Sequence, residues 1–396
     1  MSSEQLSQRT VIFVNIAHAL DHFLLLIYPT VVIALAAETG VSYASLIALA
    51  TGAFFAFGLF SLPMGWLAER YGRRNLLALF FIGSALSCLG LASAGTPAGF
   101  AGWLFVLGVF AAIYHPIGSA MLVSHASRLG RDLGWNGVWG NLGAACSPAA
   151  TALLAAAFGW RAAFIIPGLV CFGAGAAFLL MVPGDGEAHE RGGRSGSTVL
   201  LARPLLLFGL FAVAIIAGGM TFNMLTIALP KIIDERLGLA LSLEVTGSLA
   251  TVVFMFGALT QLLMGRLVDR YELPTIFAGL SLLQPLGFGL AALVLGLPLL
   301  IGLILAMAAI YGQVVVNDAM VARYVPAQYR AKAFSVRYFL GFTVSGLAAP
   351  AIAILHREGG FALVLGVASA HGLLVFASAC TFWLMTQSKR LGAKQA

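Results

Sequence analysis

The segment "GWLAERYGRR", residues 65–74, is a short charged connection between two long apolar runs, and it has a second copy, "GRLVDRYELP", at residues 265–274. Both copies begin with glycine and continue to a carboxylate, an arginine and a tyrosine. Another match follows in the same order, since "AAIY" at 111–114 returns at 308–311. Ordered self-similarity indicates an internal duplication. The chain is therefore predicted to contain two halves of the same architecture.

The composition predicts an integral membrane protein. The chain has 396 residues, of which 60% are hydrophobic and only 9% are charged, whereas soluble domains carry about 25% charged residues. The apolar runs have the length of membrane-spanning helices and lack the short alternation of an outer-membrane barrel. The polar segment 1–10 is followed by an apolar run too long for a signal peptide, so we expect it to be retained.

Hydropathy, with breaks at glycine, proline and charged clusters, predicts an all-α fold with twelve spans. Their approximate ranges are 11–36, 46–69, 75–94, 99–125, 133–157, 161–182, 204–230, 243–269, 275–294, 297–323, 332–356 and 361–386. The one long hydrophilic connection, 183–203, separates them into two bundles of six. The predicted domains are thus an N-terminal bundle, 1–182, a cytoplasmic linker, 183–203, and a C-terminal bundle, 204–396.

The arginines and lysines predict the orientation, because basic residues collect on the cytoplasmic side. With a cytoplasmic N-terminus, four basic residues in the connections lie outside: Arg161, Lys231, Arg236 and Arg357. The other basic residues of the termini and connections lie inside: Arg9, Arg70, Arg73, Arg74, Arg128, Arg131, Arg191, Arg194, Arg203, Arg266, Arg270, Arg323, Arg330, Lys332, Lys389, Arg390 and Lys394. We expect a multi-pass protein of the cell (inner) membrane with both termini in the cytoplasm. The dispersed basic residues argue against nucleic-acid binding.

Two parallel six-span halves with "GWLAERYGRR" between the second and third spans resemble the major facilitator superfamily of secondary transporters. The family's signature is matched at Gly65, Leu67, Ala68, Arg70, Gly72, Arg73 and Arg74, while Glu69 stands in place of aspartate. A carboxylate facing arginines in a short loop can latch one state of a carrier. The alternative is that the arginines only set topology and meet lipid phosphates. In the second copy Asp269 and Arg270 persist without the final arginines, which predicts a weaker latch.

The fifth predicted span, "GWNGVWGNLGAACSPAATALL", resembles the glycine- and proline-bearing helix of antiporters in this superfamily. Gly134, Gly143 and Pro148 match that pattern, and Pro148 has a counterpart in Pro350 of the second half. Ser147, Thr151 and Ala152 replace the other glycines. Small residues still allow close helix approach. With "YHPIGSA" in the fourth span and "GWRAAF" after the fifth, the chain looks like the fosmidomycin-resistance group of bacterial exporters, although Ile117 stands where that group has an acidic residue.

The first predicted span carries Asn15, His18, Asp21 and His22, which are spaced to form one stripe on a helix. A carboxylate within the bilayer is costly and is a functional candidate by default. The resemblance implies that spans 1, 4, 7 and 10 line a central cavity. Because desolvation favours the neutral carboxyl and a histidine can share its proton, Asp21 and His22 are the predicted proton-coupling pair. Asp21 as a hydrogen bond between helices and His18 as a packing residue stay open.

Further polar residues lie in other predicted spans. His115 precedes Pro116, which leaves a backbone carbonyl free, and His115 is a third proton-coupling candidate. Asp318 and Arg337 are predicted to pair, either as a gate or as a structural bridge. Arg337 binding an anionic substrate is the alternative. The predicted substrate-binding residues are His18, Tyr114, Asn223, Tyr311, Asn317 and Arg337.

The resulting hypothesis is a proton-coupled antiporter that exports a small organic compound, such as a drug or toxic metabolite, by alternating access. This function would support efflux and multidrug resistance. One alternative is a divalent transition-metal transporter using His18, Asp21, His22 and His115, and another is an importer of a small organic anion. The sequence contains no nucleotide-binding motif, and it contains neither an HExxH nor a GxSxG motif. We therefore expect no enzyme activity, no cofactor, no resident metal and a monomer whose partners are substrate, protons and lipid.

Overall fold

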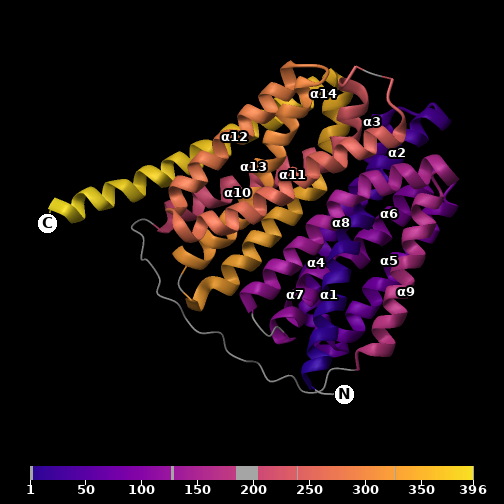
Figure 1. The fold of residues 1–396 in the computed structure, drawn as a ribbon, viewed down its shortest axis with the longest axis horizontal. Helices are drawn as coiled ribbons and strands as arrows, with labels where there is room; N and C mark the ends of the chain where they lie inside the picture. Colours follow the sequence, from indigo (N-terminus) through magenta and orange to yellow (C-terminus); the bar gives the residue numbers. More distant parts are fainter. Residues whose placement is uncertain (1–2, 126–128, 184–203, 239, 326, 396) are drawn as a thin grey trace. The chain divides into compact units, whose positions relative to one another are not determined.

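The computed structural model describes residues 3–125, 129–183, 204–238, 240–325 and 327–395, and the regular secondary structure of these residues is entirely α-helical (Figure 1). The elements of the first half are α1 (Ser3–Leu25), α2 (Ile27–Thr39), α3 (Tyr43–Ala48), α4 (Thr51–Tyr71), α5 (Arg73–Ser93), α6 (Pro97–Ala111), α7 (Tyr114–His125), α8 (Leu129–Phe158) and α9 (Ala162–Met181). Those of the second half are α10 (Pro204–Arg236), α11 (Leu243–Arg270), α12 (Leu273–Leu293), α13 (Pro298–Tyr324) and α14 (Ala327–Gln395).

Eleven helical segments of the described chain are long and apolar enough to cross a membrane. The first ten correspond one to one to the first ten predicted spans. The eleventh, Phe339–Gln387, covers much of both remaining predictions, because α14 is two helices merged across non-helical Gly359 and Gly360. The predicted all-α membrane fold is confirmed.

Three of the first ten membrane-length segments of the described chain are interrupted, and the second of them consists of α3 and α4 with Leu49 and Ala50 between them. The first span consists of α1 and α2, which are separated by the single residue Leu26. The fourth consists of α6 and α7, with the break just before Tyr114, so that Pro116 lies in the first turn of α7. A proline is tolerated in a first helical turn because the amide hydrogen that it lacks has no partner in the helix there.

The charged segment 65–74 turns sharply at Gly72. Gly72 has φ of 82°, which favours glycine because a side chain would be strained there, and it lets α5 begin directly after α4. In the second copy the equivalent residue is Glu272, with φ of −70°, and Pro274 lies at the start of α12. Since this turn uses an ordinary backbone conformation and a proline, it needs no glycine.

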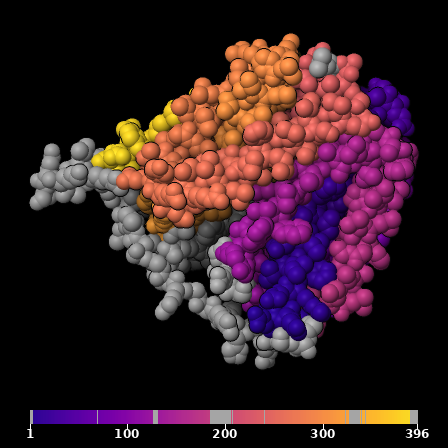
Figure 2. Space-filling model, in the orientation of Figure 1, coloured from indigo at the N-terminus to yellow at the C-terminus, as the bar shows by residue number. Residues whose placement is uncertain are grey.

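The chain divides into two compact units. Unit 1 comprises Met1–Gly193, Ile227–Asp234 and Ala240–Val252, and unit 2 comprises Arg194–Thr226, Glu235–Leu239 and Val253–Ala396. In unit 1, α1 packs along α8 and α9, and Figure 2 shows the indigo surface of α1 beside the magenta surface of α9. In unit 2, α12 packs on α13 and α14 around a core that includes Phe277, Val316 and Phe382. Of the predicted linker 183–203, only Pro183 lies among the described residues.

Candidate transport site

Helix α8 presents a stripe of small and polar residues to α1. Asn136, Gly140, Gly143 and Ser147 are spaced by 4, 3 and 4, so they share one face. A Cβ on Gly143 would lie 2.0 Å from the carbonyl oxygen of Ala19, and Ser147 Oγ donates a 2.8 Å hydrogen bond to the carbonyl of Phe23. The two backbones are therefore in direct contact along this stripe.

The three motif residues of α8 have different surroundings. Gly143 carries the close approach to α1, whereas a Cβ on Gly134 would meet nothing within 4 Å. Pro148 lies further along α8, and the next residue, Ala149, donates its amide to Thr251 Oγ1 at 3.2 Å within unit 1. A polar partner of this kind satisfies a backbone group next to a proline inside a membrane-spanning helix.

Asn136 of α8 joins three helices. Its Nδ2 donates to Asn15 Oδ1 of α1 at 2.9 Å, and its amide lies within hydrogen-bond distance of the Tyr114 hydroxyl of α7, at 3.0 and 3.2 Å. Its backbone carbonyl accepts a 2.8 Å hydrogen bond from His18 Nδ1. The side chains of Asn15, His18 and Tyr114 are buried or half-buried, so their hydrogen bonds to Asn136 fix their positions relative to one another.

Three histidines meet beside this network. His18 and His22 lie one turn apart on α1, with their Nε2 atoms 3.2 Å apart. The ring of His115, on α7, is 5.4 Å from that of His18 and 5.5 Å from that of His22, centroid to centroid. One ring nitrogen of each residue lies within 4.8 Å of the other two. We call His18, His22 and His115 the imidazole cluster.

Asp21 lies at the edge of the imidazole cluster. Its side chain is fully buried, and its Oδ2 is 3.6 Å from His115 Nε2. Among the described residues, neither carboxylate oxygen has a hydrogen-bond partner. A buried carboxyl group with so few compensating contacts inside a membrane span is a functional candidate.

Three of the predicted substrate-binding residues make contacts within the protein. Tyr114 is fully buried and stacks on His18 with ring centroids 4.7 Å apart. Tyr311, which is 2% exposed, stacks on Phe222 at 5.2 Å. Asn223 donates to the Gly219 carbonyl of its own helix at 2.8 Å. Their substrate-binding role stays a prediction, and for the two tyrosines it would require neighbouring side chains to move.

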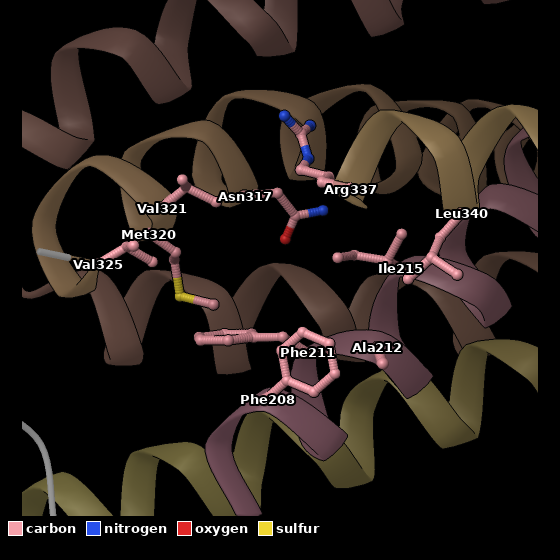
Figure 3. Close-up of a pocket in the computed structure, with 10 residues that line it drawn as sticks. All are labelled: Phe208, Phe211, Ala212, Ile215, Asn317, Met320, Val321, Val325, Arg337 and Leu340. Carbon is pink, nitrogen blue, oxygen red and sulfur yellow. The ribbon is translucent and has the colours of Figure 1, made fainter. Parts of the chain in front are cut away.

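The predicted pairing of Asp318 and Arg337 is confirmed, because an Arg337 guanidinium nitrogen contacts an Asp318 carboxylate oxygen within unit 2. The neighbouring Asn317 lines a cavity of ≈ 80 Å³ with Arg337 and the otherwise apolar side chains of α10, α13 and α14. Figure 3 shows the Asn317 amide directed into the space above Phe208 and Phe211, while Arg337 points away from them.

The arginines of the charged turn contact the ends of other helices in unit 1. Arg73 donates to Ser124 Oγ at 3.0 Å. Arg74 donates to the carbonyls of Leu179 at 2.6 Å and Val182 at 2.9 Å, at the C-terminal end of α9. These groups are backbone acceptors that α9 leaves without intrahelical partners. Arg74 thus has a capping role that the latch hypothesis did not include.

The remaining latch candidates are exposed at the surface or have side chains outside the part of the chain that the structure describes. The Glu69 side chain is outside the described part of the chain. Arg70 is exposed beside the Tyr71 ring, 5.6 Å from its centroid. Asp269 and Arg270 are exposed at the C-terminal end of α11. The latch itself stays a prediction.

Replacing Arg74 by alanine should lower the stability of the folded protein. The loss of two hydrogen bonds from a charged, half-buried donor is expected to cost about 1–3 kcal/mol, whereas Arg73→Ala, with an exposed bond to a hydroxyl, should cost less than about 1 kcal/mol. The midpoint of thermal unfolding in detergent would measure both variants. Equal midpoints would contradict the capping role.

Two residues of the site were missed in the sequence. Asn136 is a polar residue inside the apolar fifth span, and Gly140 lies one turn after it, where a Cβ would come within 2.5 Å of His18 Nε2. The signal that could have found them is their helical spacing with Gly143 and Ser147. This spacing identifies Asn136 and Gly140 as site residues only when α8 is known to lie against α1.

Comparisons with known proteins agree with this architecture. Residues 11–243 and 211–396 match the Major Facilitator Superfamily. A bacterial homolog of the human lysosomal transporter Spinster has a similar structure in its inward-facing, unoccupied and occupied conformations, with TM-scores of 0.73 and 0.76, identities of 14% and 13%, and 98% of each chain covered. A D-xylose–proton symporter aligns with a TM-score of 0.72 and 15% identity over 94% of this chain and 96% of its own. No curated protein sequence matches.

Proposed function

Since this chain belongs to the Major Facilitator Superfamily and is a multi-pass secondary transporter, we propose that it exchanges a small organic compound for protons, with Asp21 as the coupling carboxylate. The observation that carries the proposal is the environment of Asp21. This residue is fully buried, has no hydrogen-bond partner among the described residues and lies 3.6 Å from His115 Nε2. An ionisable group buried within a membrane span is costly without a partner and is a candidate for a functional role by default.

The neighbouring residues give the proton a route to Asp21. The His115 side chain is 21% exposed, whereas the Asp21 side chain is fully buried. An imidazole that contacts both the carboxylate and a more accessible space can transfer a proton between them. The His22 ring lies 5.5 Å from that of His115, centroid to centroid, and its Nε2 lies 3.2 Å from that of His18, so these rings extend the path. We assign Asp21 to hold the proton, and His115 and His22 to deliver it.

Export is supported by the α8 stripe. The close contact of Gly143 with Ala19 retains the small-residue packing of the antiporter-like helix, and Pro148 lies on the same helix. The binding of an anionic compound by Arg337 is less favoured, because Arg337 already contacts Asp318. We therefore propose that the organic substrate binds near the buried polar residues of unit 1.

The direction of proton movement tests the proposal. Full-length protein is reconstituted in vesicles that enclose a pH-sensitive dye, and ethidium or fosmidomycin is added outside, as an organic cation and an organic anion. Exchange for protons should make the interior more alkaline as the compound enters. An acidic change would indicate symport, and a compound flux without any pH change would contradict proton coupling. Vesicles without protein and vesicles with a protonophore are the controls.

A further inference from the structure

We propose that the imidazole cluster of His18, His22 and His115 binds one divalent first-row transition-metal ion, such as Zn²⁺, Co²⁺ or Ni²⁺, through one ring nitrogen of each residue. This inference goes beyond the proposed proton exchange and does not depend on it. It rests on the mutual positions of the three rings, on the hydrogen bond that orients His18 and on the space kept open by Gly140.

The distances between the nitrogens suit a tetrahedral ion. Zinc binds imidazole nitrogen at about 2.0–2.1 Å, which places two ligands of a tetrahedral site about 3.3–3.4 Å apart. The Nε2 atoms of His18 and His22 are 3.2 Å apart. One ring nitrogen of His115 also lies within 4.8 Å of a ring nitrogen of each of these residues, so a shared ion requires at most a shift of the His115 ring.

The hydrogen bond of His18 prepares it as a ligand. A backbone carbonyl can only accept, so the 2.8 Å contact with the Asn136 carbonyl means that His18 Nδ1 carries a hydrogen. In the neutral ring the lone pair is then on Nε2, the atom that faces His22. Histidine ligands of metals usually donate a hydrogen bond from the other ring nitrogen, and this bond fixes the metal-binding tautomer.

The chemistry of the ligands selects the class of ion. Imidazole nitrogens favour zinc, nickel, copper and iron, whereas magnesium and calcium require oxygen ligands. Three histidines leave the fourth position of a tetrahedral ion open to water or to a donor atom of a substrate. Asp21, 3.6 Å from His115 Nε2, lies where an ionised carboxylate offsets part of the ion's charge.

Access to the cluster depends on Gly140. A methyl group at this position would lie 2.5 Å from His18 Nε2, the proposed ligand atom. The absence of a side chain on α8 therefore leaves room at the nitrogen lone pair. Gly140→Ala offers a variant that keeps all three histidines and blocks one ligand atom.

Cobalt binding can be read optically without transport. Co²⁺ is titrated into purified full-length protein in detergent, after removal of any histidine tag, and the intense visible absorption of tetrahedral Co²⁺ is recorded. We expect saturation at one ion per chain and displacement by Zn²⁺ but not by Mg²⁺. His18→Ala and His22→Ala should each weaken binding at least about tenfold, and Gly140→Ala should weaken it as well.

The control is His371→Ala, because His371 bonds to the Val367 carbonyl of its own helix and lies outside the cluster. This variant should bind Co²⁺ as the wild type does. Size-exclusion elution and thermal midpoints check that each variant is folded. A wild-type protein without the tetrahedral spectrum, or a folded His22→Ala variant that binds normally, would overturn the proposal. Neither result depends on whether Asp21 couples protons.

Discussion

Asp21→Asn is expected to reduce the compound-driven pH change in the vesicles to the level of protein-free vesicles. Asparagine has nearly the shape of aspartate but cannot take up or release a proton in this range. The side chain is fully buried, and its oxygens have no hydrogen-bond partner among the described residues. Because asparagine has the shape of a neutral carboxyl group and the substitution breaks no hydrogen bond of the described residues, the thermal midpoint should not fall. Loss of coupling with a normal midpoint would separate a functional role from a structural one.

The matched control for this experiment is Asp234→Asn. Asp234 lies near the end of α10, where Lys231 Nζ contacts its carboxylate at 2.5 Å. This variant also removes one carboxylate, so it should keep the wild-type pH change if coupling is specific to Asp21. An unchanged signal in Asp21→Asn would show that the coupling group lies elsewhere, and Asp318 would be the next residue to replace.

Gly143→Ala should strongly destabilise the protein. The added Cβ would lie 2.0 Å from the Ala19 carbonyl oxygen and 2.8 Å from its Cα, so the clash is with backbone that no rotamer change can relieve. Helices α1 and α8 must then separate, which costs at least about 1–3 kcal/mol for an overpacked contact. The separation would also disturb the His18–Asn136 hydrogen bond. The expected result is a lower yield of folded protein, a lower thermal midpoint and weaker transport.

Gly134→Ala is the control on the same helix. A Cβ on Gly134 meets nothing within 4 Å, and alanine is more favourable than glycine in a helix by about 0.8–1.0 kcal/mol. The midpoint of this variant should therefore be equal to or above that of the wild type. If the two substitutions had the same effect, the close approach of α1 and α8 at Gly143 would not limit stability.

Sequence patterns alone sufficed to predict much of the fold, because membrane spans are recognised by local hydropathy and length. The stripe of His18, Asp21 and His22 follows from the helical period in the same way. The partner of that stripe does not, since Asn136 becomes part of the site only when α8 lies against α1. Such contacts depend on the three-dimensional packing of segments that are more than a hundred residues apart in the chain.

The motif residues show a second reason for the difference between prediction and structure. Arg74 was expected to take part in a charge latch, but it also binds the carbonyls of Leu179 and Val182. An arginine has several donors, and the sequence does not reveal which acceptors a neighbouring helix end offers. Conversely, the requirement for Gly72 could be inferred from the pattern, and its φ of 82° gives the physical cause.

The breaks inside the first and fourth membrane spans place helix ends at the imidazole cluster. His22 lies in the last turn of α1, where the aligned peptide dipoles leave a partial negative charge of roughly half an elementary unit. His115 is the second residue of α7, and the start of a helix carries a partial positive charge. One helix end therefore favours a cation near His22, and the other favours an anion near His115. The interrupted helices thus bring two helix ends of opposite partial charge to residues of the same cluster.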